Sequence, residues 1–229
     1  MGANVAFVDA LTDRADSGTS VKRLASIGAN STIYAGVVIG AKAEVLPGSV
    51  VTRSIPPNAI VEGNPASIVG YVDTTHELDS PTHQASGSNK SSVEGTPVRG
   101  VTIHRFPVIP DLRGNLTVGE FDRQVPFIPK RYFMVFDVPS REIRGEHAHR
   151  KNHQFLICLR GSCAIVADDG TCKVEINLDA PSRGIYLPPM TWGIQYKYSR
   201  DALLLVFASD YYDASDYIRD YDEFLAAIA

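Results

Sequence analysis

The sequence of 229 residues lacks the features that mark several classes of protein. It has no run of Lys and Arg, and its net charge of -4 and pI of about 5.8 give no general attraction for polyanions. Its apolar runs, such as 202–208, are far shorter than the roughly 20 residues of a membrane helix, and its first residues show no signal pattern. We therefore expect a cytoplasmic protein with neither a nucleic acid nor a membrane as its partner.

Cysteine and histidine are scarce as well. The three cysteines, Cys158, Cys163 and Cys172, are an odd number within a short strand-like stretch and form no CxxC pair. We expect them to be reduced and mostly structural. No histidine precedes His76, so any histidine chemistry must come from the rest of the chain.

One segment almost lacks large apolar residues. Residues 77–97 are rich in Ser, Thr, Gly, Pro and Asn, a composition typical of linkers. The sequence patterns on either side differ from one another. We therefore predict a first domain over residues 1–73, a linker over 74–97 and a second domain over 98–229.

The first domain contains a short internal repeat. Five hexads, IGANST, IYAGVV, IGAKAE, VLPGSV and VTRSIP, place an aliphatic residue at every sixth position: Ile27, Ile33, Ile39, Val45 and Val51. Such repeats indicate a solenoid, in which each unit buries its aliphatic side chain against its neighbours. The pattern resembles the hexapeptide-repeat family, and IPPNAIVEGNPASIVGYV resembles the segment that closes the fold in its sugar acetyltransferases. The resemblance implies a left-handed parallel β-helix.

The first domain also departs from that family. Its hexads supply about two turns, so we expect a truncated, partial β-helix. The resemblance implies acetyl-CoA as a donor, but the histidine base of many such enzymes is absent and Ser67 replaces a usual basic residue. Asp9, Asn30 and Arg53 are the remaining polar candidates for an acetyl-CoA site. A trimerising remnant fits these departures better than an active acetyltransferase does.

The second domain is a series of short strand-like segments separated by turn signals such as DDG, LDAPSRG and LPPMTWG. This spacing favours an all-β sandwich or jelly roll. A helix is expected to follow over 214–229, because its apolar residues recur at helical spacing. The predicted fold class is thus mainly β: a truncated β-helix, then a jelly roll with a C-terminal helix.

The segment GEHAHRKNHQFLICLRG places His147 and His149 two residues apart, so on a strand they share one face. An HxH motif on a jelly roll resembles the cupins, which add an acidic ligand and a later histidine to bind a metal. Here the acidic position is Gln154, and the later strand offers Trp192 and Gly193. Because carboxylate and imidazole are the main donors for divalent metals, we expect no metal. Proton transfer remains, since imidazole titrates near neutral pH.

A closer resemblance covers about residues 100–226. RGEHAHRKNHQFLICLRGSC, DDG, LDAPSRGIYLPPMTW and DALLLVFASDYYDASDYIRDYDEF occur in the same order as in the WxcM-like dTDP-4-dehydro-6-deoxyglucose 3,4-ketoisomerases. Some members of that family are fused to a hexapeptide acetyltransferase. The resemblance implies an isomerase of surface-polysaccharide biosynthesis that moves the C4 ketone of a dTDP-linked 4-keto-6-deoxy sugar to C3 without a cofactor.

Site residues follow from this resemblance. His147 and His149 are the implied acid/base pair, with His149 preferred for C3, and Arg144 is a candidate to steady the oxyanion. The implied substrate-binding residues are Arg113, Gln154, Trp192, Lys130 and Arg131, the last two near phosphate. Trp192 can equally be a core residue, and each cation can equally be a solvated surface residue.

Several alternatives stay open. The chain could also acetylate an aminosugar, or it could be a non-catalytic scaffold that binds sugar nucleotides. The resemblance implies pairing through the cupin domain, and a β-helix that assembles would add a trimer or hexamer. Arg113 resembles the family members that form a 3-dehydro-6-deoxygalactose product, which the resemblance therefore implies, whereas Gly193 lacks the side chain of those members.

Overall fold

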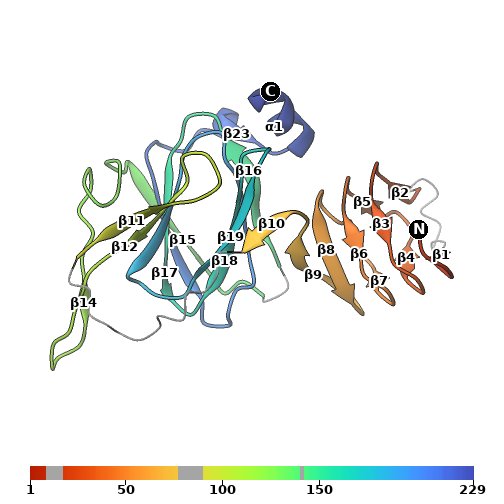
Figure 1. Cartoon of the computed structure of the whole chain (residues 1–229), viewed down its shortest axis with the longest axis horizontal. Coiled ribbons are helices and arrows are strands. Elements are labelled where there is room, and N and C mark those ends of the chain that lie inside the picture. Colours follow the sequence, from red (N-terminus) through yellow and green to blue (C-terminus); the bar gives the residue numbers. More distant parts are fainter. Residues whose placement is uncertain (9–17, 77–89, 140–141) are drawn as a thin grey trace. The chain divides into compact units, whose positions relative to one another are not determined.

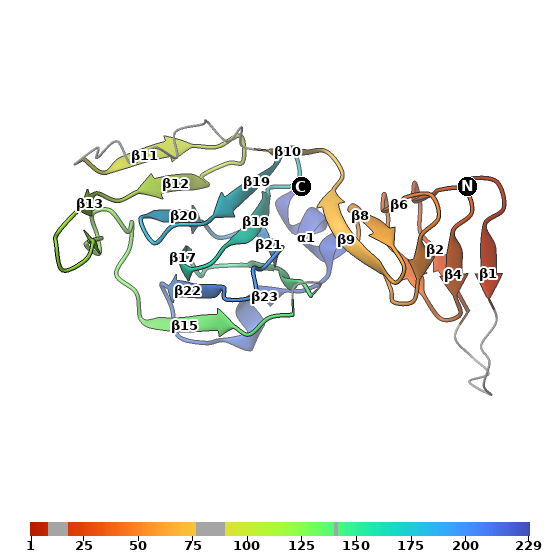
Figure 2. The same ribbon diagram turned by 90° about the horizontal axis from the view of Figure 1, so that it is seen from below.

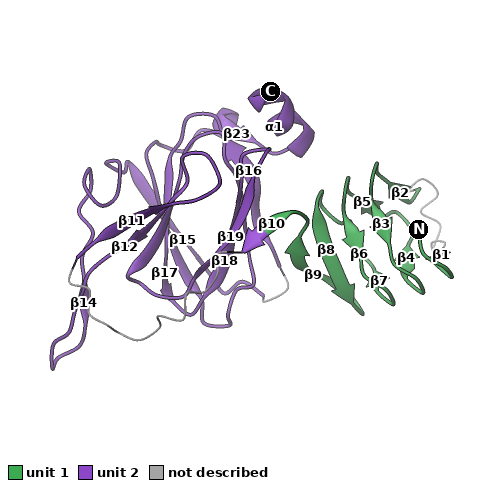
Figure 3. Cartoon of the chain, viewed as in Figure 1, with its two compact units in different colours: residues 1–74 green, residues 75–229 purple. Residues whose placement is uncertain are grey.

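The computed structural model describes residues 1–8, 18–76, 90–139 and 142–229. The chain divides into two compact units, Met1–Thr74 and Thr75–Ala229 (Figure 3). Strands dominate both, which confirms the predicted mainly β class. Among the described residues, the only α-helix is α1 (Tyr221–Ile228), and no helix there is long and apolar enough to cross a membrane.

Unit 1 consists of very short strands that stack in parallel. They are β1 (Ala6–Val8), β2 (Ser20–Val21), β3 (Ser26–Ile27), β4 (Thr32–Tyr34), β5 (Val38–Ile39), β6 (Glu44–Val45), β7 (Val50–Val51), β8 (Ala59–Gly63) and β9 (Ala66–Tyr71). The parallel pairings run β1-β4-β7, β2-β5 and β3-β6-β8, and β9 closes the unit antiparallel to β8 (Figure 1). Ser26 pairs with Glu44, 18 positions further on, so three hexads separate stacked strands.

The repeated aliphatic residues form the core of unit 1. All five, from Ile27 to Val51, are at most 3% exposed, which confirms that each hexad buries its aliphatic side chain. Glycine follows Ile27 and Ile39, where stacked backbones approach closely. A Cβ on Gly28 would lie 2.5 Å from the nitrogen of Pro47, so only glycine fits there.

Unit 2 contains two six-stranded sheets that face each other (Figure 1). The first has the order β10-β19-β18-β21-β16-β23, and the second has the order β11-β12-β20-β17-β22-β15, which Figure 2 shows from edge to edge. The strands are β10 (Thr74–His76), β11 (Ser92–Gly95), β12 (Thr102–Arg105), β15 (Arg131–Phe136), β16 (Arg144–His149), β17 (Gln154–Arg160), β18 (Cys163–Asp168), β19 (Lys173–Leu178), β20 (Arg183–Leu187), β21 (Trp192–Tyr196), β22 (Leu203–Ala208) and β23 (Tyr217–Ile218). A small hairpin, β13 (Val108–Ile109) with β14 (Leu116–Thr117), lies outside both sheets.

The core of unit 2 lies between these sheets. Fully buried aliphatic side chains come from both layers, including Leu156 and Leu204 from one sheet and Ile165 from the other. Cys158 and Cys163 are free thiols in this core, as expected for structural cysteines, and Cys172 is half-buried.

Both ends of the segment expected as a linker belong to strands. Strand β10 joins β19, where the Thr75 hydroxyl donates to the carbonyl of Lys173, and β11 pairs with β12. Polar residues suit such edge positions because edge strands are held by backbone hydrogen bonds and need no buried side chains. Residues 77–89 of the expected linker lie outside the described residues.

The C-terminal segment differs from the predicted helix over 214–229. Residues Ala214–Asp216 form a 3₁₀ turn, Tyr217 and Ile218 form strand β23, and only Tyr221–Ile228 is α-helical. The helix begins where the Asp220 carboxylate accepts from the backbone N–H of Glu223, a typical N-cap. Pairing of β23 with β16 competes successfully with helix formation for the residues before that cap.

Candidate active site

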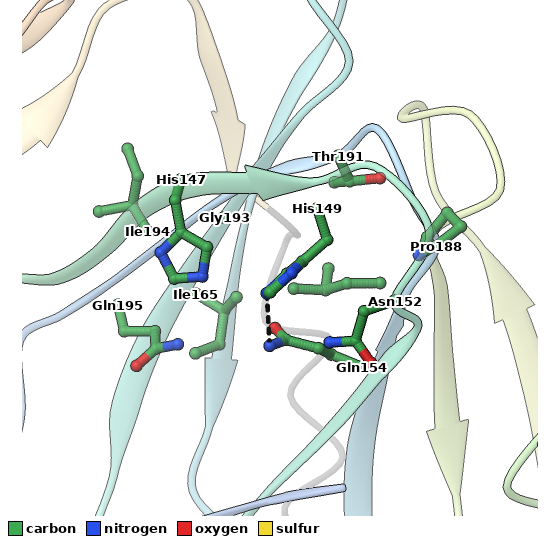
Figure 4. Close-up of a pocket in the computed structure, with 11 residues that line it drawn as sticks. His147, His149, Asn152, Gln154, Ile165, Pro188, Thr191, Gly193, Ile194 and Gln195 are labelled. Carbon is green, nitrogen blue, oxygen red and sulfur yellow. Dashed lines mark hydrogen bonds between the residues drawn. The ribbon is translucent and has the colours of Figure 1, made fainter. Parts of the chain in front are cut away.

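Strand β16 carries both histidines of the HAH motif. Gly145 and Glu146 have positive φ angles of 84° and 51°, and the pairing with β21 shifts register between Gly145 and His147. This is a β-bulge, which re-aims the residues that follow it. His147 and His149 then leave the same face of the strand, with ring centroids 5.0 Å apart (Figure 4).

The His149 ring is held at both nitrogens. Nδ1 lies 2.8 Å from Oδ2 of Asp216, and Nε2 lies 3.0 Å from the amide nitrogen of Gln154. Asp216 is itself fixed, because its other oxygen accepts from the backbone N–H of Lys151 at 2.7 Å. Since an amide NH₂ only donates and a carboxylate only accepts, this arrangement fits a neutral ring with its proton on Nδ1.

Burial controls the charge of His149. It lowers the pKa of His149 from 6.5 to about 4, outweighing the Asp216 hydrogen bond, which raises that pKa. The nearby charges of His147 and Arg131 lower the same pKa further. The ring is therefore neutral at physiological pH, with an unprotonated Nε2 at the pocket.

The His147 ring is anchored to its own strand. Its Nδ1 lies 2.9 Å from the carbonyl oxygen of Gly145, so Nδ1 donates and Nε2 is left as the acceptor. Burial lowers the pKa of His147 despite this hydrogen bond, and the charge of Arg219 lowers it further. The Tyr217 ring packs against both imidazoles, at 4.9 Å from His147 and 4.3 Å from His149.

The histidines open onto a pocket rich in amides (Figure 4). It is lined by His147, His149, Asn152, Gln154, Ile165, Leu187, Pro188, Thr191, Gly193, Ile194 and Gln195. The Asn152 oxygen accepts from the backbone N–H of Asp210 at 3.1 Å, while its buried Nδ2 has no partner among the described residues. The Gln195 oxygen accepts from the Tyr198 hydroxyl at 2.9 Å, and Figure 4 shows the Gln195 nitrogen directed into the pocket. The pocket therefore offers amide N–H donors beside two basic nitrogens.

Gln154 does line the pocket, as predicted, but Trp192 does not. Successive side chains on a strand point to opposite faces, and because Gly193 lines the pocket, Trp192 faces the other way. It packs against Tyr221 and Phe224 of α1, with centroids 5.2 and 5.6 Å away. Trp192 is buried, which fits the core role that the sequence left open for it.

The predicted cations are not gathered in the pocket. Arg113 lies in the turn of the β13–β14 hairpin, where its side chain is 89% exposed and pairs with Asp111. Lys130 pairs with Asp210 at 2.6 Å, and Arg144 is exposed at the start of β16. Arg131 points inward from the edge strand β15, and its charge reaches His149.

The candidates for acetyl-CoA lie in unit 1. Asn30 adopts a positive φ of 58° in a turn and accepts from the side chain of Asn4 at 3.3 Å. Arg53 is exposed, and Asp9 lies outside the described residues.

Sequence reasoning missed several residues of the pocket. Asp216 follows His149 by 67 positions, and Tyr217 falls within a segment whose periodicity predicts a helix. Asn152 lies within the HAH segment and Gln195 just beyond LPPMTWG, but neither position was singled out in those motifs. Across the part of the chain that the structure describes, no three His, Cys, Asp or Glu side chains group as metal ligands. Gln154, where a cupin has its acidic ligand, instead contacts His149.

Comparison with known proteins identifies the family of the segment that carries this pocket. Residues 99–229 match the sequence profile of the family described as FdtA: WxcM-like, C-terminal. This chain belongs to the FdtA family. The resemblance inferred from the HAH segment and its neighbours is thereby confirmed.

Two relatives of the FdtA segment illustrate the similarity. The TDP-4-oxo-6-deoxy-alpha-D-glucose-3,4-oxoisomerase of Aneurinibacillus thermoaerophilus is 46% identical over 124 residues, which cover 54% of this chain and 89% of that protein. The crystal structure of QdtA, a sugar 3,4-ketoisomerase from Thermoanaerobacterium thermosaccharolyticum in complex with TDP, is 38% identical with a TM-score of 0.55. That alignment covers 57% of this chain and 95% of QdtA.

A different relative matches outside the FdtA segment. The dTDP-3-amino-3,6-dideoxy-alpha-D-galactopyranose 3-N-acetyltransferase of Aneurinibacillus thermoaerophilus is 63% identical over 54 residues. These cover 24% of this chain and only 28% of that enzyme. The match supports an acetyltransferase-like segment and spans about a quarter of such an enzyme.

Proposed function

We propose that this FdtA-family chain is a nucleotide-sugar 3,4-ketoisomerase acting on dTDP-4-dehydro-6-deoxy-D-glucose. Its product would feed the biosynthesis of a dTDP-3-amino-3,6-dideoxyhexose. The observation that carries the proposal is the pair of neutral imidazoles that present Nε2 to one amide-lined pocket. The 46% identity to an oxoisomerase, covering 89% of that protein, supports the same reaction.

The isomerisation removes two protons from the sugar and adds two protons to it. Removing the C3 proton sends its bonding electrons into a C3–C4 double bond and places negative charge on the C4 oxygen. The C3 hydroxyl then loses its proton to become the new ketone, while C4 and its oxygen each gain one. No electrons enter or leave the sugar, so no redox cofactor is required.

The two histidines can hold both protons in transit. We assign removal of the C3 proton to Nε2 of His149, whose hydrogen bond from Gln154 breaks as the substrate binds, because Asp216 stabilises the imidazolium that forms. Nε2 of His147, 5.0 Å away between ring centroids, accepts the hydroxyl proton and returns a proton to the sugar. We propose that the amide N–H groups of Asn152 and Gln195, which line the same pocket, donate to the charged C4 oxygen.

Deuterium exchange tests this proposal. The protein is incubated with dTDP-4-dehydro-6-deoxy-D-glucose in deuterated water, and the sugar is followed by NMR. We expect a 3-keto product with deuterium at C4, and we expect His149→Asn to abolish its formation. The matched control His76→Asn removes an imidazole that is 66% exposed and outside the pocket, and should change nothing. Absence of both the 3-keto product and deuterium uptake in the wild type would refute the isomerase.

A second candidate function concerns unit 1. Its 63% identity over 54 residues to a sugar N-acetyltransferase favours acetyl-CoA-dependent N-acetylation, whereas the missing histidine opposes it. Adding acetyl-CoA and a dTDP-3-aminosugar tests this activity by release of free CoA. We expect none, so unit 1 would retain the fold without the reaction.

The proposal also includes the fold of each unit and the assembly of the chain. The stacked parallel strands of unit 1 support a partial left-handed β-helix, and the facing sheets of unit 2 support a cupin jelly roll. We propose a homo-oligomer that pairs through unit 2, as the resemblance implies. Light scattering of the full chain measures its oligomeric state.

A further inference from the structure

Gln195 is a pocket amide whose direction depends on another side chain. The Asn152 oxygen is held by a backbone N–H, that of Asp210, which every residue except proline could supply. The Gln195 oxygen accepts instead from the Tyr198 hydroxyl at 2.9 Å. Gln195 and Tyr198 are 8% and 2% exposed, so water competes little for this hydrogen bond. One buried side chain therefore decides the direction of the Gln195 amide.

A turn in the backbone brings Tyr198 to Gln195. Gln195 faces the pocket, so its neighbour Tyr196, the last residue of β21, faces the opposite side of the sheet. Regular alternation would send Tyr198 to that opposite side as well. Lys197 has a φ of 51°, a left-handed conformation that interrupts the alternation. Tyr198 consequently joins the core cluster between the two sheets.

The surroundings of the Tyr198 hydroxyl determine which way the amide points. That core cluster consists of aliphatic side chains and the thiols of Cys158 and Cys163, and sulfur is a weak acceptor. Within the described residues, Gln195 is the hydrogen-bond partner of the hydroxyl. An amide rotated by half a turn would present its NH₂ group to the hydroxyl and leave the buried O–H without an acceptor. Because an unsatisfied buried donor is costly, the observed direction is favoured.

The Tyr198 hydroxyl also keeps its proton at physiological pH. Burial raises the pKa of Tyr198 above its ordinary value of about 10, and the charge of Arg144 opposes this shift only in part. The protonated hydroxyl donates its one hydrogen to the Gln195 oxygen, which leaves the NH₂ group of Gln195 for the pocket (Figure 4). This direction does not change with pH across the physiological range.

We propose that Tyr198 is a positioning residue of the isomerisation: it fixes the Gln195 amide so that its N–H donates to the C4 oxygen of the sugar. The inference rests on the proposed function, which brings the sugar to His147 and His149 in the same pocket. A donor that is oriented before the sugar arrives needs no reorganisation when negative charge develops on that oxygen. Tyr198 is not among the residues that line the pocket, so it acts through Gln195.

Infrared spectroscopy of the bound sugar tests the orientation without any turnover. dTDP-4-dehydro-6-deoxy-D-glucose with an isotopic label at C4 is bound to His149→Asn, which lacks the proposed base. A hydrogen bond lowers the stretching frequency of a ketone, so adding Tyr198→Phe should raise this frequency, because the Gln195 amide is then free to rotate. The matched control Tyr196→Phe removes the hydroxyl of a 1% exposed tyrosine that bonds to Glu175, and should leave the frequency unchanged.

Steady-state kinetics tests the effect on the reaction. Tyr198→Phe keeps the ring and loses one oxygen atom, so we expect kcat to fall about tenfold, the size of one lost hydrogen bond, with KM within about twofold of the wild type. Gln195→Met removes the amide at similar volume and should lower kcat at least as much. The double variant should have the kcat of Gln195→Met, because Tyr198 acts only through Gln195. Tyr196→Phe should retain the wild-type kcat.

Each outcome decides one proposal. The same ketone frequency with and without Tyr198→Phe would overturn this inference even if the enzyme isomerises the sugar. A double variant about tenfold slower than Gln195→Met would overturn it as well, because Tyr198 would then act through packing. A frequency shift in a protein that fails the deuterium test would retain the oriented amide and refute the isomerase. A sugar that does not bind would refute both.

Discussion

At the scale of single residues, the partners of His149 determine its role. A carboxylate at Nδ1 and an amide donor at Nε2 fix one tautomer, and burial keeps it neutral down to about pH 4. An unperturbed imidazole would be partly protonated at neutral pH, and its protonated fraction could not accept a proton. The proposed base is therefore unprotonated across the physiological range.

Asp216→Asn tests the contribution of the carboxylate. Asparagine can still hydrogen-bond to Nδ1 but cannot stabilise the imidazolium with a full charge, so we expect kcat to fall about 100-fold with little change in KM. Steady-state kinetics measures this. Asp222→Asn, an exposed carboxylate in the first turn of α1, serves as the control. Equal kcat values in Asp216→Asn and wild type would remove Asp216 from the mechanism.

The depressed pKa of His149 also predicts how stability depends on pH. In the unfolded chain His149 binds a proton near its ordinary pKa of 6.5, but in the folded chain only near 4. Between these values the unfolded state binds more protons, so the free energy of unfolding falls as pH drops from 6.5 to 4, by on the order of 3 kcal/mol. Urea titrations at pH 7 and pH 4.5 should show this loss in the wild type and a smaller loss in His149→Asn. Parallel losses would contradict it.

At the scale of elements, the bulge in β16 aims the histidines. Gly145 has φ 84°, and a Cβ there would lie 2.6 Å from the carbonyl oxygen of Gly193. Any larger residue must distort either the bulge or the pairing with β21.

Gly145→Ala should therefore destabilise unit 2 by more than about 1 kcal/mol and reduce kcat, because backbone strain and the clash both act at the histidine strand. Thermal unfolding and steady-state kinetics measure the two effects. Gly95→Ala on β11, where a Cβ meets nothing within 4 Å, should leave both unchanged. Gly145→Ala with wild-type stability would show that the bulge tolerates a side chain.

The sequence predicted the features that depend on residues close together in the chain. The hexad spacing identified the buried aliphatic residues, and the HAH spacing placed His147 and His149 on one face. Non-local pairing was beyond such patterns: Ile218 pairs with Ala148, so β23 forms where helical periodicity predicts a helix. The side on which Trp192 packs was also beyond such patterns, because a motif match does not reveal which strand residues face α1.

At the scale of the whole molecule, the pocket belongs entirely to unit 2. Its lining residues lie between His147 and Gln195, whereas the hexad core of unit 1 ends before residue 74. Packing defects in unit 1 therefore remove no group from the pocket.

Ile39→Ala tests this separation. Ile39 is fully buried in unit 1, so its truncation should cost about 2–5 kcal/mol of stability there. At 25 °C, where the variant is still folded by circular dichroism, kcat and KM should stay within twofold of the wild type. Ile165→Ala, which enlarges the pocket itself, should change KM. Loss of isomerisation in folded Ile39→Ala would show that unit 1 contributes to catalysis.

The short stretch from Ser209 to Arg219 has a consequence for how such enzymes could diversify. It supports Asn152, orients His149 through Asp216, and carries Tyr212, Tyr217 and Arg219. Transplanting these eleven positions between family members would exchange the groups that surround the imidazole rings while leaving the histidine strand in place.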